Sequence, residues 1–151
     1  MNNKTYRWCF VVCEEVRVSR IGKRIRQQDY PAAIVSCADS WNSIAHSSIG
    51  QSGKVNVASY QDTPRLRSIL SSLGTIGGLR ANCKNRIGAC AEPHAARLVM
   101  KANSQVAVRD LVFSYAYRPR TKTVIRYCRN CTDVLVFRIR ETRALLFKLY
   151  R

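Results

Sequence analysis

In this chain the stretch Gly88-Ala89-Cys90-Ala91-Glu92-Pro93-His94-Ala95-Ala96 decides the expected fold, together with Tyr127-Cys128-Arg129-Asn130-Cys131. The two stretches supply three thiols, from Cys90, Cys128 and Cys131, and one nearby carboxylate, from Glu92. Three thiolates on Zn²⁺ leave a fourth position for water, which is the arrangement of a catalytic zinc site. The segment between the two stretches is long enough for a helix, a strand and a connecting loop.

The spacing of these residues suits metal chemistry. Cys128 and Cys131 are three residues apart, so at a helix start both thiols project from one turn. The free N–H groups and the positive end of a helix lower thiol pKa values and so favour metal binding. Glu92 is too close to Cys90 to complete the ligand set comfortably, but it is well placed to hydrogen-bond water at the fourth position. We therefore predict Zn²⁺ on the three cysteines, with Glu92 as general acid and base.

Hydrophobic patterns predict helices and strands in alternation. Helices are predicted at 31–43, 65–73, 91–101 and from Cys128. Pro31 suits the first turn of the first helix, and Asp29 suits its cap. Strands are predicted at 6–18 (a strand or hairpin), 54–60, 111–117 and 134–139, while 144–150 suits a helix or an edge strand equally. A turn is expected at 47–53, with basic loops at 82–88 and 118–126.

The length and the alternation together predict one domain. A chain of 151 residues is large enough to bury a core, and we expect residues 1–151 to form a single unit. Alternating strands and helices in its second half imply a three-layer α/β architecture. Both cysteine motifs then begin helices at the same edge of one sheet.

The charge balance points to a polyanionic partner. Lys and Arg number 26 against 9 Asp and Glu, which gives a net charge of +17. Such a surface attracts nucleic acid or a phosphorylated substrate, although a basic surface can also serve solubility alone. The basic run at 17–26 is either a solvated face or a phosphate-contacting arm. No basic amphipathic helix and no apolar run of about 18 to 20 residues stands out, so we expect no membrane partner.

Cysteine usage indicates where the chain acts. It has seven cysteines, an odd count, and no secretory signal is recognisable before them. Thiols that are free or metal-bound in a reducing cytoplasm fit this pattern better than a disulfide framework does. If the chain is a catalytic module of a larger secreted protein, the inference applies to its place of action.

Cys90-Ala91-Glu92-Pro93 followed by Cys128-x-x-Cys131 resembles the signature of the zinc-dependent nucleoside and nucleobase deaminase superfamily. The Cys-Ala-Glu form resembles the cytidine deaminase branch. Cys-Ala-Glu-Pro-x-Ala-Ala is similar to deaminase modules at the ends of bacterial polymorphic toxins. The resemblance covers about residues 50–140 and leaves residues 1–49 unplaced. Tyr127 departs from the pattern, which has Pro before the first cysteine of Cys-x-x-Cys.

The resemblance implies a cytidine deaminase-like fold, a three-layer α/β/α arrangement around a mixed sheet of about five strands. It also implies that Cys90, Cys128 and Cys131 hold Zn²⁺ while Glu92 shuttles protons during attack on C4 of cytosine or C6 of adenine, with loss of ammonia. We expect conversion of cytosine to uracil in nucleic acid. DNA is the expected substrate ahead of RNA, and the strand state is left open between single- and double-stranded. As a toxin effector the chain would be delivered to a cytoplasm and have an immunity protein as partner.

Further side chains are candidates for the substrate and for the sulfur ligands. Asn56 would hydrogen-bond a sugar, as a strand asparagine does in cytidine deaminases. Tyr115 and Tyr117 would stack on a base, although at least one of them is expected in the core. Either Arg129 or Arg97 would hydrogen-bond a sulfur and offset its charge.

The basic segment 118–126 is the expected grip on a nucleic-acid backbone. Its phosphate contacts are assigned to Arg118, Arg120 and Lys122, with Arg126 at its end. Such contacts position a substrate and do not specify its sequence.

Three alternatives remain open at this stage. A structural zinc module would use the same cysteines with a fourth ligand from Cys83, His94 or His46. A deaminase of free cytidine or nucleotides would have no use for so high a positive charge. In the third alternative the match to a metal site is chance, and the cysteines are small buried hydrophobic residues.

Overall fold

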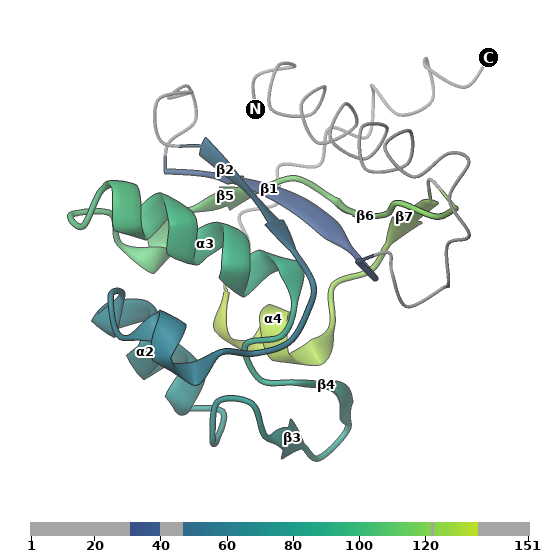
Figure 1. The fold of residues 1–151 in the computed structure, drawn as a ribbon, viewed down its shortest axis with the longest axis horizontal. Coiled ribbons are helices and arrows are strands. Elements are labelled where there is room, and N and C mark those ends of the chain that lie inside the picture. The colour runs from purple at the N-terminus through teal and green to yellow at the C-terminus, as the bar shows by residue number, and fades with distance from the viewer. Residues whose placement is uncertain (1–30, 40–46, 122, 136–151) are drawn as a thin grey trace.

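We describe residues 31–39, 47–121 and 123–135 of a computed structural model of the chain (Figure 1). These residues form a mixed α/β structure. Its elements, in chain order, are β1 (Ile34–Ala38), β2 (Ser47–Gln51), η2 (Val57–Tyr60), α2 (Pro64–Ser71), β3 (Leu79–Arg80), β4 (Cys83–Arg86), α3 (Ala91–Ala102), η3 (Val108–Asp110), β5 (Val112–Phe113), β6 (Ala116–Arg118), β7 (Thr123–Ile125) and α4 (Arg129–Val134). The expected elements at 6–18 and 144–150, and the basic run at 17–26, lie outside the described residues.

The main sheet has the order β2-β1-β6-β7, and β5 also pairs with β1. The pairing of β1 with β2 runs from Ile34↔Gln51 to Ala38↔Ser47. The resemblance implied a mixed sheet, which needs at least one parallel pair of strands. The strands that the structure describes pair only antiparallel, so among them this expectation is wrong. The small β3–β4 hairpin forms a separate two-stranded sheet.

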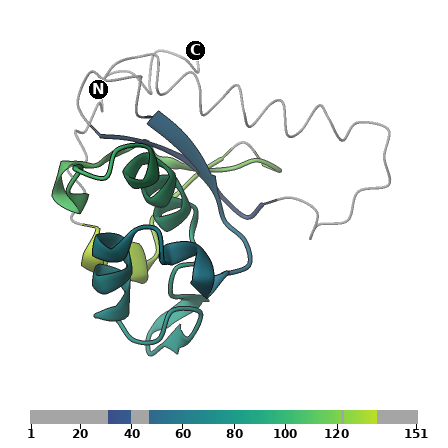
Figure 2. The ribbon, with the colours of Figure 1, turned by 60° about the vertical axis from the view of Figure 1, so that its left-hand side comes forward.

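The three α-helices within the described ranges lie on one side of the main sheet (Figures 1 and 2). Of these, α3 packs directly on β1 and β2. Val35 and Cys37 on β1 belong to the core cluster that contains the buried face of α3. The alternate β1 residues Ile34, Ser36 and Ala38 are also buried, as in a strand that is covered on both faces.

The predictions for residues 31–60 are wrong in three places. The helix predicted at 31–43 is replaced by strand β1, and the turn predicted at 47–53 by strand β2. In short apolar runs the spacing of Ile34 and Cys37 fits a helix face and a fully buried strand equally, and only the ladder partners distinguish them. Pairing with β1 overrides the weak strand propensity of Ser and Gly in β2.

The strand predicted at 54–60 is a one-turn 3₁₀ helix, η2. The side chain of Asn56 accepts a hydrogen bond from the Ala58 N–H at 3.1 Å and so caps this helix. Such a local side-chain cap competes with strand pairing. Val57, which alternation assigned to a strand face, is exposed, whereas Tyr60 is buried.

The helix predictions at the centre of the chain are confirmed. Pro64 occupies the first turn of α2, where its missing N–H costs nothing, and Leu66 and Leu70 are its buried residues. In α3 the residues that face the core are Ala95, Ala96, Val99 and Met100. Small residues allow this helix to approach the sheet closely.

The strand predicted at 111–117 is interrupted. Between β5 and β6, the Ser36 N–H donates to the Ser114 hydroxyl oxygen, and the Ser114 N–H donates to the Ser36 carbonyl. The side chain thus replaces one ladder bond, and the strand breaks. The loop predicted at 118–126 is instead mostly the β6–β7 hairpin, with Arg118 opposite Thr123.

The short helix expected from Cys128 is confirmed as α4, with Cys128 as its N-cap residue. The strand predicted at 134–139 fails at its first residue, because Val134 ends α4. Its remainder, from 136 onward, is outside the described residues. The loop predicted at 82–88 contains β4, which pairs with β3 across a turn where Asn82 has a φ of 64°.

Candidate metal centre

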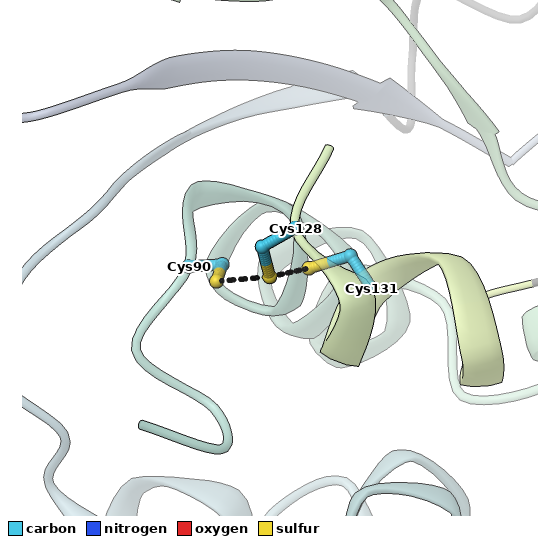
Figure 3. Close-up of side chains that lie close together, drawn as sticks. All are labelled: Cys90, Cys128 and Cys131. Carbon is cyan, nitrogen blue, oxygen red and sulfur yellow. Dashed lines mark hydrogen bonds between the residues drawn. The ribbon is translucent and has the colours of Figure 1, made fainter. Parts of the chain in front are cut away.

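Three thiols converge at the starts of two helices (Figure 3). Cys90 is the N-cap residue of α3, Cys128 is that of α4, and Cys131 lies in the first turn of α4. The Sγ atoms of Cys90 and Cys128 are 3.0 Å apart, and those of Cys128 and Cys131 are 3.6 Å apart. All three sulfurs lie within 4.8 Å of one another.

This geometry fits one metal ion. Tetrahedral zinc with Zn–S bonds of about 2.3 Å holds its sulfur ligands about 3.8 Å apart. The Cys128–Cys131 distance of 3.6 Å is close to this value, the Cys90–Cys128 distance of 3.0 Å is clearly shorter, and the 4.8 Å limit exceeds it. Three soft thiolate donors suit zinc in preference to hard cations such as Mg²⁺. The three cysteines are therefore close enough to bind a metal ion, and their chemistry is compatible with zinc.

The electrostatics of the cluster favour a cation. Hydrogen bonds with Cys131 and Cys90 hold the pKa of the Cys128 thiol far below its ordinary value. The same hydrogen bonds to Cys128 raise the pKa values of the Cys90 and Cys131 thiols, and burial adds to the effect. Three thiolates this close repel one another strongly, so all three can ionise together only when a positive ion lies among them.

Backbone geometry at Gly88 sets the approach to Cys90. Gly88 has a φ of 82°, which disfavours any residue with a side chain, and an added Cβ would lie 3.3 Å from Ile76 and from Tyr60. The Tyr60 hydroxyl donates to the Gly88 carbonyl at 2.7 Å. The turn before α3 is therefore fixed by a buried hydrogen bond and a residue that only glycine replaces easily.

Glu92 lies beside the thiols. It is 3% exposed, and its Oε2 atom lies 3.4 Å from the Cys131 Sγ atom. Burial raises the pKa of its carboxyl group. A raised pKa makes the carboxylate a stronger base than an ordinary glutamate, which suits it to proton transfer.

A cavity of about 530 Å³ borders the thiols. Its lining includes Cys90, Cys128 and Glu92. Of the described residues around it, Glu92 is the one acid, and the basic ones are Lys84, Arg86, Arg118 and Arg126. The cavity therefore joins the thiols and a buried carboxyl group to a rim of positive charge.

Two asparagines support the cluster, and sequence analysis missed both. The Asn85 side-chain amide donates to the Cys90 Sγ atom at 3.6 Å. The Asn130 amide donates to the Asn85 carbonyl at 2.8 Å, and Asn130 is buried between the ligand-bearing positions of α4. These bonds connect β4 to both helix starts. Asn85 precedes Cys90 by only five residues, but only the β3–β4 hairpin turns its side chain to the sulfur.

Of the two arginines proposed for the sulfurs, Arg97 is bound elsewhere. The Arg97 guanidinium forms a salt bridge with Asp62 at 2.7 Å and donates to the Ser59 carbonyl. It therefore links α3 to η2 and the start of α2, and the asparagine at position 85 makes the polar contact to sulfur. Arg129 is an exposed residue of α4.

The candidates for a fourth ligand differ in position. Among residues 31–39, 47–121 and 123–135, the group of potential ligands contains Cys90, Cys128 and Cys131, without Cys83 or His94. The His94 ring lies 6.3 Å from the Tyr60 ring. Burial lowers the pKa of His94, and the nearby charge of Arg97 lowers it further. His46 is outside the described residues.

The predicted substrate contacts are only partly gathered at the cavity. Arg118 lines it, and Arg120 is exposed beyond the end of β6. Asn56 caps η2, Tyr117 is buried in β6, and Tyr115 is half-buried between β5 and β6; none of these three lines the cavity. Lys122 is outside the described residues.

No family model, curated protein or solved structure matches this chain. Among the described residues, no helix has both the length and the apolar character needed to cross a bilayer. The functional argument therefore depends on the geometry of the site and on its residues.

Proposed function

We propose that the chain is a zinc-dependent hydrolytic deaminase that converts cytosine to uracil in nucleic acid. One observation carries the proposal: a buried carboxyl group and two of three thiols suited to zinc line one cavity, and the third thiol lies beside that carboxyl group. Glu92 lies 3.4 Å from one of these thiols and lines that cavity with Cys90 and Cys128. The resemblance of Cys90-Ala91-Glu92 and Cys128-x-x-Cys131 to the deaminase signature supports the same chemistry.

The residues of the site divide the reaction between them. Zinc bound by the cysteines would supply the Lewis acidity that makes water nucleophilic near neutral pH. Glu92 accepts one proton as the water oxygen bonds to C4 of cytosine and passes it to N3, and it then carries the second proton of that oxygen to the amino nitrogen. The C4–N bond breaks, ammonia leaves, and the water oxygen remains as the carbonyl of uracil. The raised pKa of the Glu92 carboxyl group suits both steps.

A structural zinc module is the main competing interpretation. It requires a fourth protein ligand, and the cluster within the described part of the chain offers three. A buried carboxyl group that also lines a cavity has no use in a closed structural site. A deaminase of free cytidine is disfavoured by the four basic side chains around the same cavity.

Replacement of Glu92 tests the proposal directly. The zinc-loaded protein is incubated with single-stranded DNA, double-stranded DNA, RNA and free cytidine, and uracil formation and ammonia release are measured. Glu92→Gln is expected to keep about one zinc per chain while the deamination rate falls by at least about 10²-fold. Cys90→Ser is expected to lose the zinc.

Two outcomes would contradict the proposal. The first is a zinc-loaded protein that deaminates none of the four substrates. The second is release of zinc by Cys83→Ser, since a fourth thiolate ligand closes the position that the reaction needs.

The resemblance to toxin modules extends the proposal to the cell. As an effector, the chain would act in a cytoplasm and be neutralised by an immunity protein. Expression of the wild-type chain in bacteria is expected to accumulate cytosine-to-thymine mutations and reduce growth, and Glu92→Gln to remove both effects. Equal toxicity of the wild-type and Glu92→Gln forms would show that growth inhibition does not depend on deamination.

A further inference from the structure

We infer that the β3–β4 hairpin is a nucleic-acid-binding arm, and that a single strand crosses the cavity between this hairpin and the β6–β7 hairpin. The inference rests on the proposed function and names the residues and the strand state of its substrate. Sequence analysis assigned phosphate binding to segment 118–126, offered the run at 17–26 as an alternative arm, and assigned no such contact to β4. Lys84 and Arg86 of β4 now join Arg118 and Arg126 around the same cavity.

The two hairpins present charge from separate parts of the chain. In Figure 1 the β6–β7 hairpin lies above α4, and the β3–β4 hairpin lies below it. Arg118 ends β6, and Arg126 follows directly after β7. Lys84 and Arg86 are two residues apart on β4 and so lie on one face of that strand. The cavity therefore has cations on two sides.

These four cations are free to meet an external anion. All four are exposed, and none forms an ion pair with another residue that the structure describes. Arg86 donates one guanidinium hydrogen bond to the Gly77 carbonyl at 2.9 Å, which orients the group and leaves its other donors available. In contrast, Arg80 and Arg97 are neutralised by Asp133 and Asp62.

The position of β4 relative to the thiols is fixed. Asn85, between Lys84 and Arg86, hydrogen-bonds the Cys90 sulfur and accepts a hydrogen bond from Asn130. The backbone that carries the two basic residues is therefore held at a defined place relative to the thiols. Phosphate contacts of this kind set the register of a strand without reading its bases.

The shape of the site favours a single strand. A base must reach the thiols and Glu92 at the wall of a cavity of about 530 Å³ while its flanking phosphates remain at the rim. A base stacked within a duplex cannot do so unless it is unpaired and extruded, which costs a few kcal/mol. A single strand presents its bases without that cost.

Binding of a dye-labelled single-stranded oligothymidine, which contains no cytosine to deaminate, tests the inference. Fluorescence anisotropy over a salt series would compare the zinc-loaded wild type, Lys84→Gln/Arg86→Gln, Arg118→Gln/Arg126→Gln and a charge-matched control, Arg67→Gln/Arg109→Gln. Arg67 and Arg109 are exposed and do not line this cavity. Zinc content and thermal midpoint would be measured for every variant.

Each pair of rim substitutions is expected to weaken binding about tenfold at moderate salt. The slope of log K against log salt should fall by about 1.4, since each phosphate contact to a single strand contributes about 0.7. The control should change affinity less than about twofold. Equal binding by Lys84→Gln/Arg86→Gln and the control would overturn the role of the β3–β4 hairpin. Tighter binding of a duplex than of the single strand would overturn the assigned strand state.

Failure of the inference is distinct from failure of the proposed function. A wild type that deaminates cytosine, together with a Lys84→Gln/Arg86→Gln variant that binds like the control, would overturn the inference alone. A wild type that deaminates nothing would overturn the proposed function, and the anisotropy series would still decide whether β3–β4 binds a strand.

Discussion

The helices α3 and α4 each begin at a cysteine of the cluster, yet different forces hold them. In α3, seven of the twelve residues are buried, and the helix packs on β1 and β2. In α4, which has six residues, the buried ones are Asn130 and Cys131. One half of the metal centre thus lies on a helix with a long buried face, and the other half lies on a short helix that reaches the hydrophobic core mainly through Cys131 and the following Leu135.

Polar anchors compensate in part for the small core of α4. The Tyr127 hydroxyl, at the position where the deaminase pattern has Pro, donates to the Ser114 carbonyl. Asn130 donates to Asn85, and Asp133 pairs with Arg80 at 2.5 Å. Each of these contacts contributes little to stability in water. A metal ion bound by Cys128 and Cys131 would therefore contribute most of the stability of α4. This difference between the two helices predicts that α4 depends on the metal ion and that α3 does not.

Metal removal should produce the largest contrast. Chelation of the zinc-loaded protein is expected to raise amide hydrogen exchange in 128–135 by at least about 10²-fold, because binding free energy to a thiolate site is also local folding free energy. Residues 95–100 of α3 should keep their protection. The measurement is exchange followed by mass spectrometry; equal loss of protection in both helices would contradict the comparison.

Core packing of α3 gives the next largest effect. Val99→Ala is expected to lower the free energy of unfolding by about 2 kcal/mol, since it leaves a cavity at a fully buried position. Leu98→Ala, at the exposed neighbouring position, should change it by less than about 0.5 kcal/mol. Chemical denaturation measures both. Similar losses for the two variants would show that α3 is not held by its buried face.

Removal of the Asn85 side chain tests the bridge between the two helix starts. Asn85→Ala is expected to weaken zinc binding about tenfold, because it deletes the hydrogen bond to the Cys90 sulfur. The measurement is competition with a chromogenic chelator. Asn103→Ala, in which the side chain at the far end of α3 no longer accepts a hydrogen bond from the Gln105 N–H, is the control. Unchanged zinc affinity in Asn85→Ala would show that the 3.6 Å contact does not support the ligand.

The smallest effect is expected from the ion pair that joins β3 to α4. Arg80→Ala removes a salt bridge in which both side chains are about one-third exposed, so the free energy of unfolding should fall by less than about 0.5 kcal/mol. Exchange protection of α4 in the zinc-loaded form should hardly change. A loss above about 1 kcal/mol would mean that this pair stabilises the protein more than an exposed ion pair ordinarily does.

Some features of this fold could be predicted from local sequence. The starts of α3 and α4 were correct because they depend on neighbouring residues, such as the first-turn Pro93 in α3. The strands β1 and β2 were missed because their identity depends on partners far along the chain. Ser36, for example, hydrogen-bonds Ser114, which is 78 residues away. No local pattern contains that information.

The same division applies to the site. Residue type and spacing identified Cys90, Cys128 and Cys131 as candidate ligands, which the structure brings within 4.8 Å of one another, and Glu92 as the nearby acid. The partner of the sulfur was assigned to an arginine, and the structure places Asn85 there. A side chain that meets the sulfur through a hairpin depends on the path of the backbone, whereas ligand identity depends on donor chemistry alone.

By itself, the sequence determined the donor set, the acid beside it, the helices that begin at Cys90 and Cys128, and the excess of positive charge, because each follows from residue type or from contacts within one helical turn. Only the tertiary structure decided which cations surround the cavity and which helix the core supports. Those properties come from long-range strand pairing and from burial, which depend on residues far apart in the chain.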